Sequence, residues 1–164
     1  MACLTVFTGA DSGHYSEKRY ETFQTACPQM GDGMILTIKT KQQTELIDIT
    51  AKIKTALQSH DIQDGFCFLY VPHTTAAVTI NESADPSVPS DILMVLNQVI
   101  PWKAGYRHLE GNSPAHIKST LVGASEMIAI ENGQLVLGTW QGIFFCEFDG
   151  PRTRKLHLRF SHRI

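Results

Sequence analysis

The sequence predicts a single α+β domain built on a largely antiparallel sheet with about three helices. Three observations lead to this class. The 164-residue chain has the length of one domain. Its apolar runs are short and strand-like, whereas only a few segments repeat apolar residues at helical spacing. Strands and helices do not alternate regularly, which argues against a parallel sheet made of βαβ units.

The predicted strands follow from short apolar or alternating runs bounded by turn residues. They cover residues 34–39, 45–49, 66–71, 76–80, 126–131, 134–137, 142–148 and 155–160. The run at 66–71 is apolar at every position, which predicts a strand covered on both faces. Asn132-Gly133 predicts a hairpin, because both residues tolerate a positive φ.

Three helices are predicted from capping residues and apolar spacing. The first begins near Thr50, a plausible N-cap, and the second follows Asp85 and ends at Pro101. The third covers residues 114–122 and has a proline in its first turn. Residues 1–33 lack sustained periodicity and are predicted to be an extension of a domain at 34–164. Either Met34 is the original start, or the extension is a genuine tail.

Composition and charge exclude several classes of function. The chain is 43% hydrophobic and 18% charged, as in globular domains, and its formal net charge is -2. With no strong field, we expect no nucleic-acid partner. We also expect no membrane partner and a cytoplasmic location, because every apolar run is far shorter than the roughly 20 residues of a membrane span. Cys67 and Cys146 lie in apolar runs and are predicted to be buried free thiols.

Histidine placement is the first pointer to chemistry. His73 follows the buried strand at 66–71, while His108 and His116 bracket a loop that can fold back. Three imidazoles and one open position are typical of a catalytic zinc site. Spacing alone leaves the alternative open that these are surface or hydrogen-bonded histidines.

Two further segments carry candidate polar groups. Glu82 follows the strand that leaves the His73 turn, so we expect its carboxylate near the imidazoles as a general base or ligand-orienting group. Asp85 is interpreted as a helix cap rather than a catalytic group. Arg152 offers a planar fork suited to phosphate. The neighbouring basic residues, including Arg154, are interpreted as the solvated face of an edge strand.

Several sequence blocks together resemble the YjbQ-like family. They are Pro72-His73-Thr74-Thr75-Ala76-Ala77, Asn81-Glu82 to Asp85-Pro86, His108, Asn112 to His116, Gly138-Thr139-Trp140-Gln141 and Glu147 to Arg152. The resemblance covers about residues 34–160. It implies an α+β sandwich that assembles as a homotrimer, with pockets near subunit contacts that hold a divalent metal ion, zinc first, or an anion.

The resemblance also implies an activity and roles for single residues. Members of the family are associated with a secondary thiamine-phosphate synthase activity, which joins a pyrimidine pyrophosphate to a thiazole phosphate and releases pyrophosphate. The partner is then a small phosphate-bearing molecule. The implied metal ligands are His73, His108 and His116, and Glu82 is the implied catalytic acid or base. The implied substrate-binding residues are Asn81, Asn112, Trp140, Gln141 and Arg152.

Two alternatives to the transferase stay open at this point. One is a metal-dependent hydrolase of a small phosphoester or amide, in which Glu82 moves the proton. The other is a non-catalytic trimer that binds a metal ion or anion. Metal-dependent turnover of phosphoesters or amides would distinguish the hydrolase. Binding of a ligand that is not consumed would distinguish the non-catalytic trimer.

Overall fold

The computed structural model describes residues 33–162 of the chain. Most of the predicted N-terminal extension, residues 1–32, lies outside the described residues, as do residues 163 and 164. None of the helices in the described part is long and apolar enough to cross a bilayer.

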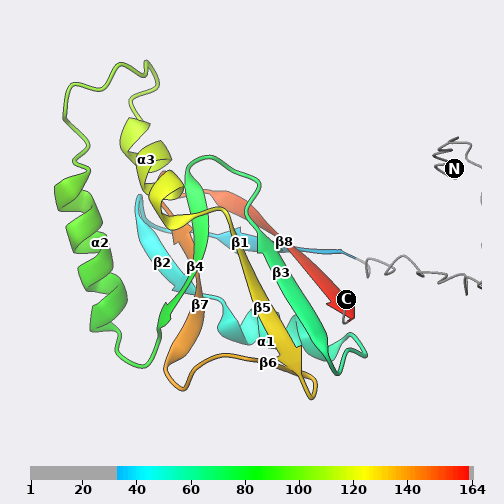
Figure 1. Cartoon of the computed structure of the whole chain (residues 1–164). Helices are drawn as coiled ribbons and strands as arrows, with labels where there is room; N and C mark the ends of the chain where they lie inside the picture. The colour runs from blue at the N-terminus through cyan, green and yellow to red at the C-terminus, as the bar shows by residue number, and fades with distance from the viewer. Residues whose placement is uncertain (1–32, 163–164) are drawn as a thin grey trace, which may run out of the picture.

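The described chain folds into two antiparallel sheets that face each other (Figure 1). The five-stranded sheet has the order β1 (Met34–Lys39), β8 (Thr153–His162), β3 (Gly65–Tyr70), β5 (Ser125–Glu131) and β6 (Gln134–Leu135). The three-stranded sheet has the order β2 (Glu45–Asp48), β7 (Gln141–Glu147) and β4 (Ala76–Glu82). All strand pairs are antiparallel. The predicted α+β class is confirmed.

The main core lies between the two sheets. Alternation along β8 turns Leu156, Leu158 and Phe160 into this core, opposite Ile143 and Phe145 of β7. The helix α1 (Thr50–Gln58) closes one end of the core with its apolar side chains.

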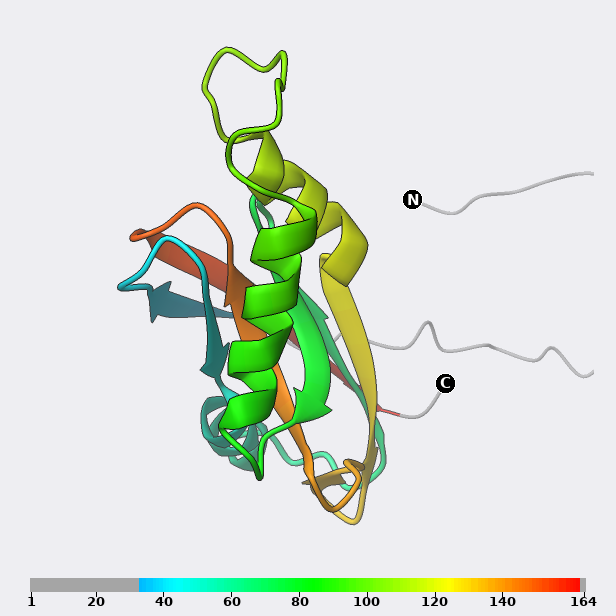
Figure 2. The ribbon, with the colours of Figure 1, turned by 90° about the vertical axis from the view of Figure 1, so that its left-hand side faces the viewer.

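A second, smaller core lies on the other face of the three-stranded sheet. There Phe144, Cys146 and Phe148 pack beneath α2 (Ser87–Val99) and α3 (Ser113–Val122). Figure 2 shows both helices on this side of the molecule. Strand β7 is therefore covered on both faces, which explains its unbroken apolar sequence.

The prediction that β3 is covered on both faces is wrong for a single chain. Phe68 and Tyr70 are 41% and 42% exposed, because none of the described helices covers the outer face of the five-stranded sheet (Figure 1). Ile35 and Met127 lie exposed on the same face as these two aromatic residues. This sheet face therefore exposes apolar side chains to solvent, with Arg159 of β8 opposite Phe68.

Local signals at the turns and helix starts are largely confirmed. Asn132 and Gly133 form the predicted hairpin with φ values of 50° and 72°. Asp85 Oδ1 accepts the Ser87 N–H at 2.8 Å, and this hydrogen bond lowers the pKa of the aspartate. At α1 the cap differs from the prediction, since Asp48 Oδ1 accepts the N–H of Thr50.

The two described cysteines are buried free thiols, as predicted. Burial raises the pKa of Cys67 to about 12 and that of Cys146 likewise to about 12. Neither thiol is therefore activated as a nucleophile.

Candidate functional site

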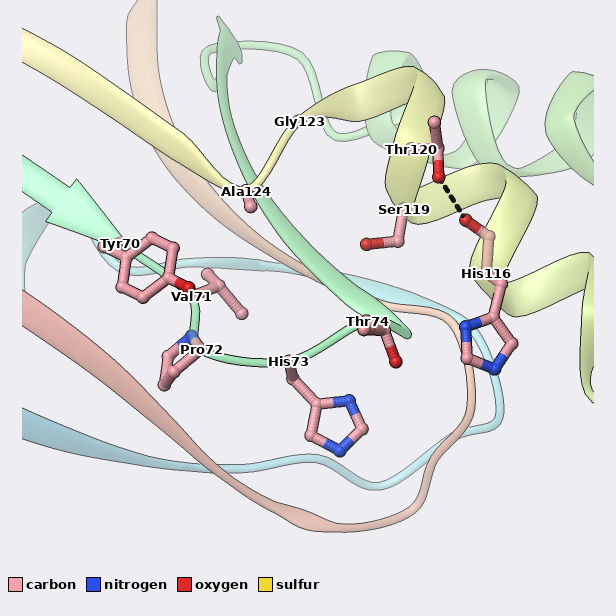
Figure 3. A pocket seen from close by; sticks show the side chains of 10 residues that line it. All are labelled: Tyr70, Val71, Pro72, His73, Thr74, His116, Ser119, Thr120, Gly123 and Ala124. Atoms are coloured by element: carbon pink, nitrogen blue, oxygen red, sulfur yellow. Dashed lines mark hydrogen bonds between the residues drawn. The ribbon is translucent and has the colours of Figure 1, made fainter.

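An open cavity of about 690 Å³ lies where the β3–β4 connection meets α3. Figure 3 shows the side chains that line it. The lining residues are Tyr70, Val71, Pro72, His73, Thr74, His116, Ser119, Thr120, Gly123 and Ala124. The histidines are the chemistry-bearing side chains among them.

His73 and His116 reach this cavity from different elements. His73 lies in the connection after β3, where its N–H donates to the Val71 carbonyl at 2.9 Å. His116 lies in the first turn of α3, which begins at Ser113 with proline as its second residue. Both imidazole rings project to the same side, with Thr74 between them (Figure 3). The fold thus brings two of the three predicted histidines to one cavity.

His108 lies beside His116 in an adjoining hollow of about 350 Å³. The ring centroids of these two histidines are 5.3 Å apart in an edge-to-face arrangement. His108 Nε2 is also 3.7 Å from Oε2 of the Glu110 carboxylate. His116 therefore connects the two hollows.

The three histidines do not fit a zinc site made by one chain. Within residues 33–162, no group of three or more histidine, cysteine, aspartate or glutamate side chains is placed to hold a metal ion. Three protein ligands are the usual minimum for catalytic zinc. The zinc ion itself stays a prediction, and no step below depends on it.

Beneath the cavity lies a buried ion pair that sequence reasoning did not place in the site. Arg154 donates from Nε and Nη2 to the Glu147 carboxylate at 2.7 and 2.6 Å. The same carboxylate accepts the Thr40 hydroxyl and the N–H groups of Phe148 and Asp149. Arg154 and Glu147 are 3% and 0% exposed, so both charges are fully compensated inside the protein.

The environment of Glu147 favours its ionised form. Burial raises the pKa of Glu147, but the hydrogen bonds from Arg154, Asp149 and Thr40 and the charge of Arg154 outweigh burial. The pKa is therefore held below its ordinary value of 4.5.

The interpretation of Arg154 as part of a solvated edge-strand face is wrong. Strand β8 lies between β1 and β3, and Arg154 points inward. The sequence contained this signal, because side chains alternate along a strand and Arg154 is therefore on the same face as the inward Leu156 and Leu158.

A second, exposed ion pair lies beside the buried one. Arg152 donates from Nη2 to Asp149 Oδ2 at 2.7 Å, and Asn112 Nδ2 donates to the same oxygen at 3.1 Å. The Arg152 side chain is 51% exposed. Within the described residues, Asn112 Oδ1 is buried without a hydrogen-bond partner. The structure therefore brings Asn112 and Arg152 together at Asp149, although neither is among the residues that line the His73 cavity.

The charges of both arginines act on His73. Burial, followed by the positive charges of Arg154 and Arg152, lowers the pKa of this histidine below its ordinary value of 6.5. Glu147 and Asp149 oppose this effect without cancelling it. His73 is therefore neutral at pH 7 and lies in a positive field.

The remaining predicted site residues lie at the opposite end of the three-stranded sheet. His73 precedes β4 and Glu82 ends it, and the seven residues of this strand span roughly 20 Å. Asn81 and Glu82 pair with Gly142 and Gln141 of β7. The expectation that the Glu82 carboxylate lies near the imidazoles is therefore wrong within one chain.

The side chains at this far end have mainly local contacts. Asn81 Oδ1 accepts the N–H of Glu82 at 2.8 Å, and Gln141 Oε1 accepts the N–H of Gly138 at 2.8 Å. Trp140 is 65% exposed. A Cβ on Gly142 would lie 2.6 Å from Ser83 Cβ, so that glycine is required by a close chain contact.

The comparisons with known proteins agree with this fold. A sequence model of the family described as "UPF0047 protein YjbQ-like" matches residues 34–163. The chain belongs to this family.

Relatives in the YjbQ-like family are similar along most of the domain. UPF0047 protein YugU of Bacillus subtilis is 53% identical over 125 residues, covering 76% of this chain and 95% of the relative. UPF0047 protein MJ1081 of Methanocaldococcus jannaschii is 55% identical over 122 residues, covering 74% and 88%.

Solved structures of the YjbQ-like family share the fold. An uncharacterized conserved protein of Clostridium acetobutylicum has a TM-score of 0.76 at 50% identity, covering 77% of this chain and 98% of that one. A protein of Sulfolobus solfataricus has a TM-score of 0.77 at 31% identity, covering 80% and 97%.

Proposed function

We propose that the His73 cavity binds the phosphate groups of a small molecule and that the protein is a transferase of the thiamine-phosphate synthase type. One observation carries the proposal. Two imidazoles line one open cavity, and the guanidinium groups of Arg152 and Arg154 are near enough to lower the pKa of His73. An imidazole N–H in a positive field, such as that of His73, suits the oxygens of phosphate or pyrophosphate.

The chemistry of the proposed reaction matches this arrangement. A ring nitrogen of the thiazole phosphate forms a bond to the pyrimidine methylene carbon, and the bond from that carbon to pyrophosphate breaks. Pyrophosphate leaves with the electron pair, so the main demand is stabilisation of a departing anion. Arg152 and His73 are the groups that we propose for this role.

The position of Glu82 favours the transferase over the hydrolase. Bond formation at a neutral ring nitrogen releases no proton, and therefore needs no general base. A hydrolase needs a base that moves a proton from water. Glu82 lies at the far end of β4, away from the cavity of the same chain.

The direct test is product formation by purified protein. The full chain is incubated with a pyrimidine pyrophosphate and a thiazole phosphate, and thiamine phosphate and pyrophosphate are measured. We expect both products, and also restored growth of a cell that lacks thiamine-phosphate synthase. Pyrophosphate binding without any product would leave a non-catalytic anion-binding protein instead.

We further propose that the chain assembles as a homotrimer, as the resemblance implies. Against the rest of residues 33–162, no side chain of α2 is fully buried, and Val99 of this helix is 72% exposed. The outer sheet face with Phe68 and Tyr70 is also apolar and open. Such surfaces commonly mark protein contacts. Sedimentation equilibrium tests the proposal, with an expected mass three times that of the chain.

A further inference from the structure

We propose that Thr75 and Arg154 fix the ring proton of His73 on Nε2, so that His73 enters the cavity as a hydrogen-bond donor to an anionic oxygen rather than as a metal ligand. The inference about the ligand rests on the proposed phosphate-binding function. The inference about the proton rests on hydrogen bonds alone. Thr75 and Arg154 are positioning residues, since they act through His73.

The first step is the hydrogen bond from the backbone. The Thr75 N–H donates to His73 Nδ1 at 3.2 Å. A backbone N–H can only donate, so Nδ1 must present its lone pair. The proton of a neutral imidazole is then on Nε2.

The second step is the direction of the Thr75 hydroxyl. Arg154 Nη2 donates to Thr75 Oγ1 at 3.0 Å, and a guanidinium has no acceptor to offer in return. The hydroxyl proton is therefore available to His73 Nδ1, which lies 3.1 Å from Thr75 Oγ1. Two donors converge on the same ring nitrogen.

The third step is the contact that holds the Arg154 guanidinium in place. Arg154 is held by Glu147, whose carboxylate is itself occupied by donors from Thr40 and from the backbone. Arg154 and Thr75 are 3% and 1% exposed, so the part of this chain from Glu147 to Thr75 is shielded from water, while His73 at its end is exposed to the cavity. The direction of every donor, from the guanidinium to the imidazole, is thereby set inside the protein.

The consequence concerns the kind of ligand. A histidine that binds a metal through one nitrogen usually donates the N–H of its other nitrogen to a carbonyl or carboxylate. His73 has the opposite arrangement, because Nδ1 receives hydrogens. Nε2–H is then suited to an oxygen of phosphate or pyrophosphate.

The test is a long-range proton–nitrogen NMR spectrum of the full chain with ¹⁵N-labelled histidine. A His73→Gln variant assigns the His73 signals among those of the 7 histidines. We expect the shift of an unprotonated nitrogen at Nδ1 and that of an N–H at Nε2. A proton on Nδ1 of the wild-type protein would overturn the inference.

Two variants test the positioning role. Thr75→Val removes the hydroxyl but keeps the backbone N–H, so it should shift the His73 Nδ1 signal while the proton stays mainly on Nε2, whereas Thr75→Ser should restore the wild-type shifts. Identical shifts in the valine variant would overturn the role of the hydroxyl and of Arg154. Because the serine variant keeps the hydroxyl and loses only the methyl group, it separates the effect of the hydroxyl from that of any other change at this position.

Added ligands separate this inference from the proposed function. Inorganic pyrophosphate should shift the His73 Nε2 signal, while one equivalent of Zn²⁺ should leave it unchanged. A zinc-dependent shift at Nε2 overturns the donor role. Absence of pyrophosphate binding, with the proton on Nε2, overturns the proposed function and leaves the positioning by Thr75 supported.

Discussion

Arg152 and Arg154 lie two residues apart and form ion pairs of similar length, but one pair is exposed to solvent and the other is buried. Arg154 meets Glu147 at 2.6 Å with both side chains buried. Arg152 meets Asp149 at 2.7 Å with its guanidinium half exposed. The pairs differ in burial and in geometry, because Arg154 donates to both carboxylate oxygens of Glu147, whereas Arg152 donates to one carboxylate oxygen and to the backbone carbonyl of Asp149.

The comparison indicates that the buried pair has a structural role, whereas the exposed pair is available to bind a ligand. The buried pair is closed by hydrogen bonds and orders the side chains beneath the cavity, including Thr75. The exposed pair keeps a charged fork in contact with water, where a ligand can exchange for solvent. Substitution of Arg154 should therefore affect mainly stability, and substitution of Arg152 should affect mainly ligand affinity.

The largest expected effect is on stability. Arg154→Met should lower the free energy of unfolding by about 3–5 kcal/mol, because it leaves the buried Glu147 charge without its partner. Arg152→Met should lower it by less than about 1 kcal/mol, because exposed pairs contribute little. Urea denaturation at one protein concentration measures both. Equal losses would contradict the comparison.

The next effect is on ligand affinity. Arg152→Ala should weaken pyrophosphate binding about tenfold or more, since a hydrogen bond from a charged group contributes roughly 1.5–3 kcal/mol. Arg159→Ala is the matched control, because Arg159 is an exposed arginine of β8, the strand that follows Arg152, and lies on the outer sheet face. Calorimetric titration compares the two. A similar loss in both variants would indicate attraction by overall charge instead.

A smaller effect is expected on acid stability. The folded-state pKa of Glu147 is below its ordinary value of 4.5, so its stabilising contribution is complete above that pH. The contribution is lost as the pH falls from there through the folded-state pKa. The free energy of unfolding should therefore decrease less steeply between pH 5 and pH 3, roughly, in Glu147→Gln than in the wild type. Parallel curves would place the acid sensitivity elsewhere.

The smallest effect is expected at the far end of the three-stranded sheet. Glu82→Gln should leave the pyrophosphate affinity within about twofold of wild type, because β4 separates Glu82 from the cavity of its chain by roughly 20 Å. The same titration measures it. A tenfold loss would mean that a second protomer brings its Glu82 to the cavity, which a mixed oligomer of Arg152→Ala and Glu82→Gln chains can test by restored binding.

Most elements of the fold were predictable because their signals are local. The hairpin at Asn132-Gly133, the cap at Asp85 and the proline-started third helix each depend on a few adjacent residues. The histidines were also predictable as a group, since two of them reach one cavity and the third adjoins it.

The errors concern residues whose environment is set by distant parts of the chain. Glu82 follows the His73 turn closely in sequence, yet an extended strand carries it to the other end of the sheet. Arg154 is one of several basic residues in sequence, yet it is the one that meets the Glu147 carboxylate. Thr75 carries no signal of its own, because its role depends on an arginine 79 positions away.

The sequence by itself determined the strands, the helices, the turn chemistry and the family, since propensity, capping and motif order are properties of short segments. Only the tertiary structure decided which polar groups meet. Pairing of β7 with β4 places Glu147 beside the start of β4, next to Thr75, and Arg154, which pairs with Ile38 of β1, reaches both from the other sheet; all three side chains are buried. In that environment each donor must find an acceptor, and this requirement fixes the orientation of His73.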